Sequence, residues 1–562
     1  MIMAEYNKWL NSDLLTEEEK EELRSIENDI KEIESRFYTN LSFGTAGMRG
    51  IRGIGKNRMN RYNIWKATQG LANYIINSTA EIGKEKGVAI AYDCRLDSED
   101  NARNTAMVLA GNGIKVYLFK SLRTTPELSF ATRELKAQAG IMITASHNPK
   151  EYNGYKVYWE DGAQIVDPQA KGIVESVNNV DIFTDIKKMD FNEALEKKLI
   201  EYIGEKVDER YIEEVKKNAI NIDIPNKEKF KIVYSPLHGT AGRPVTRVLK
   251  EMGFESVEVV KEQIHPDGNF PTCSYANPED TSVFKLSMEL ADKTGAKLCI
   301  ANDPDGDRVG IAILDENKNW FIPNGNQIGI LIAEYIVNYK KNIPANGTMI
   351  TTIVSTPLFD TIVEKNGLRT FRTLTGFKYM GEKIRQFENK ELDGTFLFSF
   401  EESIGYLIGT HVRDKDAVVS SMLIAEMAAF YDSKASSLYR ELIRIYEKYG
   451  WRLEKTIPVT KGGKDGLDEI SRIMRRLREV EHKEIVGIKV RKYLDFDQNV
   501  NGLPKSDVVQ LILEDETYLT VRPSGTEPKI KYYISVVDAD KKIAEKKLEK
   551  VVDGFKKYVE SL

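Results

Sequence analysis

The sequence predicts a multidomain α/β protein with mixed, largely parallel sheets and a smaller C-terminal α+β domain. Strand-like apolar runs alternate with amphipathic stretches over most of the 562 residues, which is the pattern of α/β units. Two short segments recur at domain-scale separation: IVYSPL at 232–237 resembles IVSTPL at 353–358, and LANYIIN at 71–77 resembles IAEYIVN at 332–338. After about residue 450 the predicted order becomes strand, helix, strand, loop, strand.

Four domains are expected, because a chain of this length exceeds what one hydrophobic core supports. Charged, loop-like regions near residues 215 and 320 and the change of pattern near 450 mark the boundaries. The predicted domains are an α/β domain at 1–215, a second at 216–320, a third at 321–450 and an α+β domain at 451–562. The charged stretch up to about residue 36 is most simply a solvated helix.

The charge balance argues against a large anionic partner. The chain has 81 Lys and Arg against 86 Asp and Glu, with both signs interspersed. We therefore expect neither nucleic acid nor an anionic membrane surface as a partner. A small anion is not excluded, because a few local cations are enough to bind it.

The chain has the features of a cytoplasmic protein. Its N-terminal segment lacks the basic region and apolar stretch of a signal peptide. The apolar helical stretches at 328–337 and 417–430 are short and contain Glu334 and Glu426, so neither could span a bilayer. Three widely spaced cysteines without a CxxC pair suggest neither a disulfide framework nor a zinc ribbon. Nothing in the sequence indicates the oligomeric state.

Three polar loops directly follow apolar strand-like runs, where α/β sheets place their ligands. They are TASHNP at 144–149, ANDPDGDR at 301–308 and FEESIGY at 400–406.

The second of these loops predicts a magnesium site. Asp303, Asp305 and Asp307 alternate on a loop with proline and glycine, and their converging charges call for a hard cation with oxygen ligands. An EF-hand does not fit, because Arg308 replaces the loop glycine and Leu314 stands where the bidentate glutamate belongs. Arg308 is placed to meet a phosphate. The alternative is a solvated acidic turn.

The first loop offers a serine at the mouth of a buried strand. Ser146 could carry a phosphate that completes the magnesium shell, with the metal activating it. His147 could assist the phosphoryl group, and Lys156 is the nearest downstream cation that could return to the site. The alternatives are a hydrogen-bonded turn that closes the strand, an exposed turn histidine and a solvated lysine.

Further loops supply phosphate and hydroxyl ligands. In VRPSGTEPK at 521–529, backbone amides, two hydroxyls and Arg522 can converge on one phosphate, although the stretch could also be an ordinary turn. In FEESIGY, Glu401, Glu402 and Ser403 suit sugar hydroxyls, and the alternative is a surface turn. The glycine-containing loops at 43–50 and 373–378 add Arg49 and Lys378 as cations for a transferring dianion.

The motifs TASHNP, DPDGDR, EES and RPSGTEPK occur in the order and approximate spacing of the α-D-phosphohexomutases, the phosphoglucomutase and phosphomannomutase superfamily. The chain resembles this family over essentially its whole length. The variants FGTAGMRG, SPLHGTAG and TLTGFKYMGEKI are most similar to the branch of phosphoglucomutases and phosphopentomutases related to mammalian phosphoglucomutase-2.

The resemblance implies a heart-shaped molecule in which three related α/β domains and a capping C-terminal domain surround a central cleft. It implies Ser146 as the phosphoserine, which also contributes to the metal site, and Asp303, Asp305 and Asp307 as the Mg²⁺ ligands. The residues implied around the transferring phosphoryl group are His147, Arg49, Arg308 and Lys378, the last as a general acid or base. The residues implied or expected to bind substrate are Glu401, Ser403, Thr375, Gly376, Arg522, Ser524, Gly525 and Thr526.

The implied reaction shifts a phosphate between glucose 1-phosphate and glucose 6-phosphate. The phosphoserine phosphorylates the free O6, and the resulting glucose 1,6-bisphosphate turns end for end and returns its O1 phosphate to Ser146. Phe400 stands where many relatives have glycine, and Ala46 where many have serine, so pentose and mannose phosphates stay alternative substrates. A metal-dependent serine phosphatase or a non-catalytic phosphosugar binder would be the remote alternatives.

Overall fold

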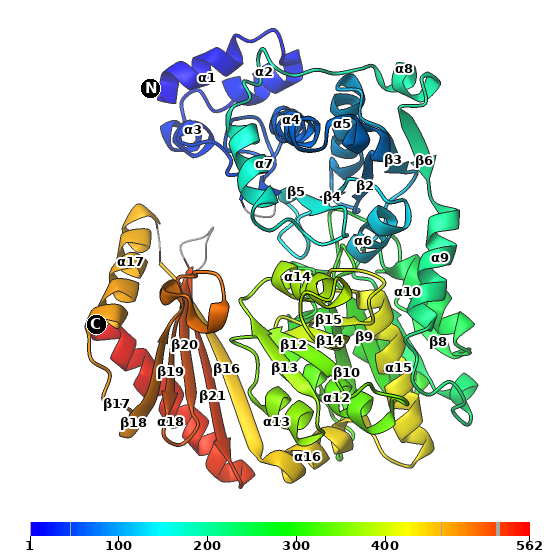
Figure 1. Ribbon diagram of the computed structural model, residues 1–562, viewed down its shortest axis with the longest axis vertical. Coiled ribbons are helices and arrows are strands. Elements are labelled where there is room, and N and C mark those ends of the chain that lie inside the picture. Colours follow the sequence, from blue (N-terminus) through cyan, green and yellow to red (C-terminus); the bar gives the residue numbers. More distant parts are fainter. Residues whose placement is uncertain (1, 45–46, 462, 524–528) are drawn as a thin grey trace. The chain divides into compact units, whose positions relative to one another are not determined.

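The computed structural model describes residues 2–44, 47–461, 463–523 and 529–562 (Figure 1). The chain divides into two compact units. Unit 1 comprises Met1–Asn324, Phe377–Ser399 and Ser403–Ala435, and unit 2 comprises Gly325–Gly376, Phe400–Glu402 and Ser436–Leu562. Within the described ranges, no helix is both long and apolar enough to cross a membrane.

The N-terminal stretch forms three short helices with a buried face. They are α1 (Ile2–Leu10), α2 (Glu17–Arg24) and α3 (Ile30–Phe37). Trp9 and Phe37 are buried in one cluster that also holds Leu23 and Ile33. The prediction of one solvated helix was wrong, because a stripe of apolar residues lies among the charges and packs against the domain that follows.

The first sheet has the order β1-β5-β4-β2-β3-β6. Its strands are β1 (Gly47–Ile51), β2 (Val88–Tyr92), β3 (Val116–Phe119), β4 (Ala139–Ile143), β5 (Tyr152–Trp159) and β6 (Ile200–Ile203). β2 pairs in parallel with β3 and β4, whereas β5 runs antiparallel to both β4 and β1. The carboxyl ends of β2 and β4 therefore open at the same edge of the sheet.

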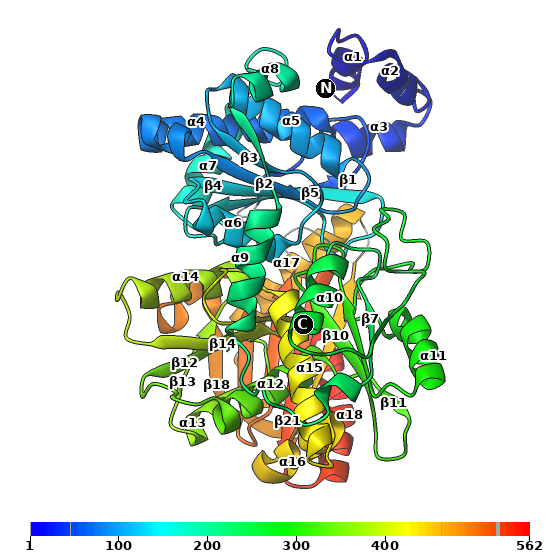
Figure 2. The same cartoon turned by 90° about the vertical axis from the view of Figure 1, so that its right-hand side faces the viewer.

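Helices cover both faces of this sheet, as Figure 2 shows for α4 and α5 on one face and α6 on the other. The helices of this region are α4 (Arg61–Lys86), α5 (Ser98–Gly111), α6 (Thr125–Glu134), α7 (Gln169–Asn178), α8 (Phe191–Glu196) and α9 (Glu205–Lys216). α6 begins with a capping box in which the Thr124 hydroxyl accepts from the Glu127 amide and the Glu127 carboxylate accepts from the Thr124 amide.

The second sheet has the order β11-β10-β9-β7-β8. Its strands and flanking helices are β7 (Ile232–Ser235), α10 (Gly242–Glu251), β8 (Val257–Val259), α11 (Lys285–Thr294), β9 (Leu298–Asn302), β10 (Val309–Leu314) and β11 (Trp320–Phe321). β7 pairs in parallel with β8 and β9, and β10 turns back antiparallel to β9. Residues 303–308 form the connection between β9 and β10.

The third sheet has the order β13-β12-β14-β15. The elements of this part of the chain are α12 (Gly325–Tyr339), β12 (Gly347–Thr352), α13 (Leu358–Lys365), β13 (Arg369–Thr373), α14 (Phe377–Glu388), β14 (Thr395–Glu401), β15 (Gly405–Ile408), α15 (Ala417–Ser433) and α16 (Leu438–Tyr449). The N-terminus of α15 is capped by the Asp416 carboxylate, which accepts from the amides of Val418 and Val419.

The fourth sheet, of order β16-β21-β20-β19-β18-β17, is antiparallel throughout. Its elements are β16 (Trp451–Thr460), α17 (Gly463–Glu479), β17 (Glu484–Ile485), β18 (Ile488–Asp495), β19 (Val509–Leu513), β20 (Tyr518–Pro523), β21 (Lys529–Asp538) and α18 (Lys541–Glu560). Apolar residues of the sheet and both helices share one core, as an α+β layer requires.

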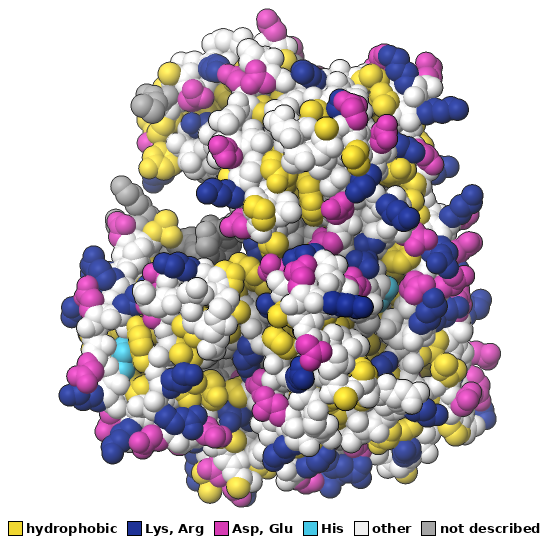
Figure 3. Space-filling model, in the orientation of Figure 1, with side chains coloured by type: hydrophobic (Ala, Val, Ile, Leu, Met, Phe, Trp, Pro, Cys, Tyr) yellow, Lys and Arg dark blue, Asp and Glu magenta, His cyan; other side chains and the backbone are white. Residues whose placement is uncertain are grey.

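These elements confirm the predicted fold class of mixed α/β sheets followed by an α+β domain. Figure 3 shows positive and negative side chains interspersed over the face in view, as the composition predicts. One repeat differs from expectation, because residues 232–235 form β7 whereas the matching segment at 353–358 begins just after β12 ends. The exact domain boundaries stay a prediction.

Candidate active site

Ser146 lies immediately beyond β4, in a backbone conformation that is rare for a serine. Its φ is 52°, in the left-handed region, and the Thr144 hydroxyl accepts a hydrogen bond from its amide at 2.8 Å. The Ser146 hydroxyl donates to Asp303 Oδ2 at 2.9 Å and lies 3.2 Å from His147 Nδ1. The predicted phosphoserine and a predicted metal ligand are therefore in direct contact, although their loops are far apart in sequence.

The buried guanidinium of Arg95 donates hydrogen bonds to backbone carbonyls in and beside the loop that carries Ser146. Its Nη2 donates to the carbonyls of Ser146, at 2.5 Å, and Asn148, and its Nη1 donates to the carbonyls of Pro149 and Tyr152 at 2.9 and 3.1 Å. Asp93 lies 3.4 Å from Arg95 Nε. One side chain thus fixes the whole turn that carries the serine.

Each of the three aspartates between β9 and β10 uses its two oxygens differently. Asp303 Oδ1 accepts from the amides of Asp307 and Arg308 at 3.1 and 2.9 Å, which shapes the loop. Asp305 Oδ2 accepts from Lys156 Nζ at 2.8 Å and from the Thr125 hydroxyl at 2.9 Å.

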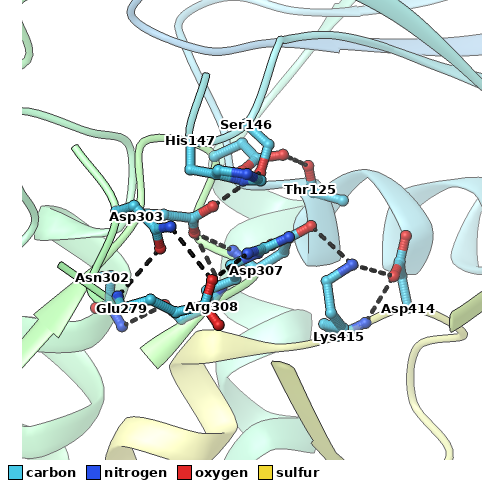
Figure 4. Close-up of polar contacts among 12 residues, drawn as sticks. Thr125, Ser146, His147, Glu279, Asn302, Asp303, Asp307, Arg308, Asp414 and Lys415 are labelled. Carbon is cyan, nitrogen blue, oxygen red and sulfur yellow. Dashed lines mark hydrogen bonds and ion pairs between the residues drawn. The ribbon is translucent and has the colours of Figure 1, made fainter. Parts of the chain in front are cut away.

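Asp307 Oδ2 lies 3.1 Å from Lys415 Nζ and 3.7 Å from Lys156 Nζ. Figure 4 shows Ser146 above Asp303 and Asp307, and Lys415 to their lower right beside Asp414.

The three aspartates together can supply ligands for a metal ion. Asp305 Oδ1 and Asp307 Oδ1 are buried and receive no hydrogen bond from the described residues. One ligand oxygen from each of the three aspartates lies within 4.8 Å of the others. Buried carboxylate oxygens without donors are costly unless a cation binds them, so this set fits a hard divalent ion.

The electrostatics agree with a cation site. Burial raises the pKa of Asp303 well above its usual range, and the charges of Asp305 and Asp307 add to this. Burial acts in the same direction on Asp305, but the Lys156 ammonium and donated hydrogen bonds outweigh it and lower the pKa of Asp305. Burial together with the charges of Arg308 and Arg49 lowers the pKa of His147, so this imidazole is neutral at pH 7.

Two predicted arginines border the serine and the aspartates. Arg49 lies on β1, and its Nη1 donates to Asn148 Oδ1 at 3.0 Å. The Arg308 guanidinium lies 3.5 Å from Glu279 Oε2 and 3.8 Å from Asp307 Oδ1. The structure therefore brings Ser146, His147 and the aspartates together with Lys156 and both arginines.

Lys378, in the first turn of α14, faces a separate cavity of about 240 Å³ that Asp167 and Glu382 also line. Burial lowers the pKa of its ammonium, and the two carboxylates oppose this shift. A lysine with a lowered pKa is suited to proton transfer.

The chain passes from unit 2 to unit 1 within the predicted sugar loop. Glu401 Oε1 accepts from the Gly376 amide at 2.7 Å, which links the loop to the segment that holds Thr375. Glu402 Oε2 accepts from the hydroxyls of Thr352 and Ser355 at 3.1 and 3.2 Å. Ser403 is the first residue of its stretch in unit 1, and its contribution to a sugar site stays a prediction.

Arg522 lies in unit 2 at the end of β20. Burial raises the pKa of Tyr533, the Glu402 charge adds to this, and Arg522, which hydrogen-bonds to the Tyr533 side chain, opposes it. Arg522 is therefore electrostatically connected to the glutamate loop within unit 2. The other predicted phosphate ligands, Ser524, Gly525 and Thr526, lie outside the described residues.

Three protein-family models match the chain in sequence order. They describe the alpha/beta/alpha domains I, II and III of phosphoglucomutase/phosphomannomutase, and they cover residues 40–182, 209–316 and 324–446. The chain belongs to the phosphoglucomutase/phosphomannomutase family.

A relative that matches most of the chain agrees with this assignment, and two solved structures share the fold. The chain is 38% identical over 526 residues to a phosphoglucomutase of Staphylococcus aureus (strain USA300), covering 91% of this chain and 92% of the relative. A phosphoglucomutase/phosphomannomutase family protein of Burkholderia thailandensis superposes with a TM-score of 0.68 at 19% identity, over 93% of this chain and 98% of that one. The open form of the Paramecium phosphoglucomutase pp63/parafusin gives 0.66 at 18% identity, over 92% and 94%.

Sequence reasoning missed several residues that shape the site of this phosphoglucomutase/phosphomannomutase family member. Arg95 and Asp93 directly follow the apolar strand β2, so the rule that located the other loops could have found them. Lys415 stands in the polar run RDKD between β15 and α15. Thr125, at the start of α6, carried no sequence signal that we can identify.

Proposed function

We propose that the protein is a phosphoglucomutase that reversibly converts α-D-glucose 1-phosphate to glucose 6-phosphate. The reaction would proceed through phosphorylated Ser146 and glucose 1,6-bisphosphate. The observation that carries the proposal is the 2.9 Å hydrogen bond between Ser146 Oγ and Asp303 Oδ2, inside a set of three aspartates. The relatives named phosphoglucomutase, which match about nine-tenths of the chain, support the choice of sugar.

The residues around Ser146 have complementary roles in this proposal. Ser146 Oγ carries the phosphoryl group, and Asp303, Asp305 and Asp307 hold Mg²⁺. When bound, Mg²⁺ supplies positive charge that stabilises the transferring phosphoryl group. Lys156, Arg49 and Arg308 add fixed positive charge. The neutral imidazole of His147 can donate or accept a hydrogen bond at Nδ1, depending on its tautomer.

Burial of the serine supports a transfer that avoids hydrolysis. Ser146 is only 3% exposed. A site that limits the access of water favours transfer to a sugar hydroxyl over transfer to water. Lys378, whose pKa burial lowers, is proposed as the group that exchanges a proton with that hydroxyl.

Substrate binding is proposed for two sets of residues. Glu401, Ser403, Thr375 and Gly376 would bind the sugar hydroxyls or orient their neighbours. Arg522, Ser524, Gly525 and Thr526 would bind the phosphate that is not being transferred. The partner is thus a small phosphosugar, with Mg²⁺ and glucose 1,6-bisphosphate as cofactors, in a cytoplasmic setting.

Substrate assays on the purified full chain test the proposal. With Mg²⁺ and trace glucose 1,6-bisphosphate, glucose 1-phosphate should yield glucose 6-phosphate faster than ribose 1-phosphate or mannose 1-phosphate is isomerised. Release of inorganic phosphate instead would identify a phosphatase. If neither isomerised product nor inorganic phosphate formed, the protein would be a non-catalytic phosphosugar binder. Faster turnover of the pentose or mannose phosphate would overturn the choice of sugar but not the mutase reaction.

A covalent test addresses Ser146 directly. Intact mass should show one phosphoryl group on the wild type and none on Ser146→Ala, which should also lose mutase activity. Ser98→Ala, a buried serine that donates to Asp93 rather than to an aspartate of the metal set, is the matched control. A phosphoryl group that persists in Ser146→Ala would remove this serine from its role.

A further inference from the structure

Lys415 contacts a proposed metal ligand from a segment far along the chain. Its Nζ lies 3.1 Å from Asp307 Oδ2 and 3.3 Å from Asp414 Oδ1. The Lys415 side chain is only 10% exposed. Burial of a lysine ammonium is costly unless carboxylates lie beside it, so these two contacts stabilise its placement.

The segment that carries Lys415 is tied to the elements around the site. Asp414 Oδ2 accepts from the Tyr158 hydroxyl at 2.7 Å and from Gln164 Nε2 at 3.2 Å. On the other side of Lys415, the Ala417 amide donates to the Gly306 carbonyl at 3.2 Å. The backbone on both sides of Lys415 is therefore fixed, one side to β5 and the loop after it and the other to the aspartate loop.

A glycine sets the path of the lysine stem. A Cβ on Gly405 would lie 2.1 Å from Lys415 Cδ, far inside van der Waals contact. The Lys415 stem therefore crosses β15 where the strand has no side chain. The Phe377 ring lies near the end of this stem, and its centroid is 5.7 Å from Lys415 Nζ.

The two oxygens of Asp307 divide their roles because of Lys415. Oδ2 faces the lysine, and Oδ1 is buried and receives no hydrogen bond from the described part of the chain. Asp305 shows the same division, with Lys156 on Oδ2 and a buried Oδ1. Partners that hold one oxygen of a carboxylate orient the other toward a metal and tune its affinity.

We infer that Lys415 is a positioning residue of the metal site. By holding Oδ2 of Asp307, it turns Oδ1 toward the ion. The inference rests on the proposed function, since it assumes that these aspartates bind Mg²⁺.

Calorimetric titration of the full chain with Mg²⁺ tests this role. Lys415→Met keeps an unbranched stem and removes the ammonium, and we expect its dissociation constant for Mg²⁺ to rise about 10- to 100-fold. Lys293→Met, at an exposed position of α11, should bind as the wild type does. The unfolding temperature without Mg²⁺ is measured in parallel, because a lysine that only stabilises the fold would change that temperature and leave the dissociation constant alone.

A second variant reaches the same contact without removing the lysine. Gly405→Ala must displace the Lys415 stem, so it should also weaken Mg²⁺ binding. Combined with Lys415→Ala, which removes the stem, Gly405→Ala should add little further weakening. Full additivity of the two substitutions would show that Gly405 acts by another route and would count against the inference.

Asp305→Asn separates this inference from the proposed function. Mg²⁺ binding by the wild type that is lost in Asp305→Asn would establish the metal site. If Lys415→Met or Gly405→Ala then bound within twofold of the wild type, the role of Lys415 would be refuted while the site stood. If the wild type itself bound no Mg²⁺, the metal site and the inference would both fall.

Discussion

Arg95 shows how a single buried side chain can set the geometry of a reactive residue. Its guanidinium donates to three carbonyl oxygens of the loop between β4 and β5, including that of Ser146, and to the carbonyl of Tyr152 at the start of β5. A guanidinium presents donors in a rigid fork, whereas a lysine ammonium is a point charge on a flexible stem. Retaining positive charge at this position is therefore not enough to retain the turn.

We expect Arg95→Lys to lower kcat/KM for glucose 1-phosphate by about 100-fold, because a displacement of about 1 Å in a reacting group costs this much. Steady-state kinetics would measure the effect. Arg103→Lys is the control, since Arg103 is exposed on α5 and its guanidinium lies 4.4 Å from the centroid of the Phe191 ring. Activity of Arg95→Lys within threefold of the wild type would contradict the role given to the fork.

At the scale of elements, α6 carries a carboxylate that couples stability to pH. Glu127, in the capping box of this helix, is 3% exposed. Burial raises its pKa to about 7, which the Asp208 charge reinforces and the Arg123 guanidinium opposes. The folded protein thus binds this proton more tightly than the unfolded chain, whose glutamate has a pKa of about 4.3.

The sign of the pH dependence follows from linkage. Because the folded state holds more protons between these two pKa values, the contribution of Glu127 to the free energy of unfolding falls as pH rises from about 4.3 to 7. The total loss is about 4 kcal/mol. Glu127→Gln lacks this titration, so its unfolding temperature relative to the wild type should increase between pH 5 and pH 8.

Thermal unfolding across that pH range checks this expectation, with Glu81→Gln on the exposed part of α4 as the control. A constant offset between Glu127→Gln and the wild type at every pH would contradict it. Such an offset would mean that the carboxyl group titrates alike in the folded and unfolded states.

The packing of α12 against β14 depends on a glycine opposite a large ring. A Cβ on Gly329 would lie 2.6 Å from two carbons of the Phe400 ring, and Phe400 is fully buried. Alanine normally favours a helix over glycine by up to about 1 kcal/mol. In this helix we expect Gly329→Ala to destabilise instead, by about 1–3 kcal/mol, because the core is overpacked.

Chemical unfolding would measure this loss, and the double substitution Gly329→Ala with Phe400→Leu should recover part of it. A single variant as stable as the wild type would show that the ring can move. The same contact explains why phenylalanine stands before the EES motif: its ring fills the core beside α12 and Phe359, 5.1 Å away between centroids.

Some of this structure follows from local sequence and some does not. β4 and β9 are predictable because apolar runs end in turn-forming residues, and the loops after them therefore carry the site. Lys156 and Lys415 illustrate the limit. Whether a lysine is solvated or buried against a carboxylate depends on which distant strand ends meet, and one sequence does not encode that in any local pattern.

The prediction for the N-terminal helices was wrong for a different reason. Their charged residues dominate the composition, while the few apolar positions that bury Trp9 and Phe37 set the structure. Residues 524–526 stay predictions, because they lie outside the described ranges. The roles of Glu401 and Ser403 also stay predictions, since they depend on a bound sugar.

For the molecule as a whole, metal binding should be linked to unfolding. The three aspartates belong to unit 1, so Mg²⁺ stabilises that unit when bound to its folded form. At a free concentration of 100 times the dissociation constant, the expected gain is about 2.7 kcal/mol. Differential scanning calorimetry should show a higher unfolding temperature with Mg²⁺ for the wild type but not for Asp305→Asn.

Hydrogen exchange would show which segments become more stable when Mg²⁺ binds. Protection should increase in residues 303–308 and in the loop after β4. An equal rise in unfolding temperature for Asp305→Asn would show that Mg²⁺ binds elsewhere.

Each compact unit is assembled from stretches that alternate along the chain. No single start or stop codon can therefore produce either unit alone, and a nonsense mutation anywhere before the last helix removes part of unit 2. A continuous fragment of the gene therefore does not encode one unit by itself, so the units cannot be recombined or expressed as separate modules by simple truncation. Both units therefore evolve within one continuous reading frame.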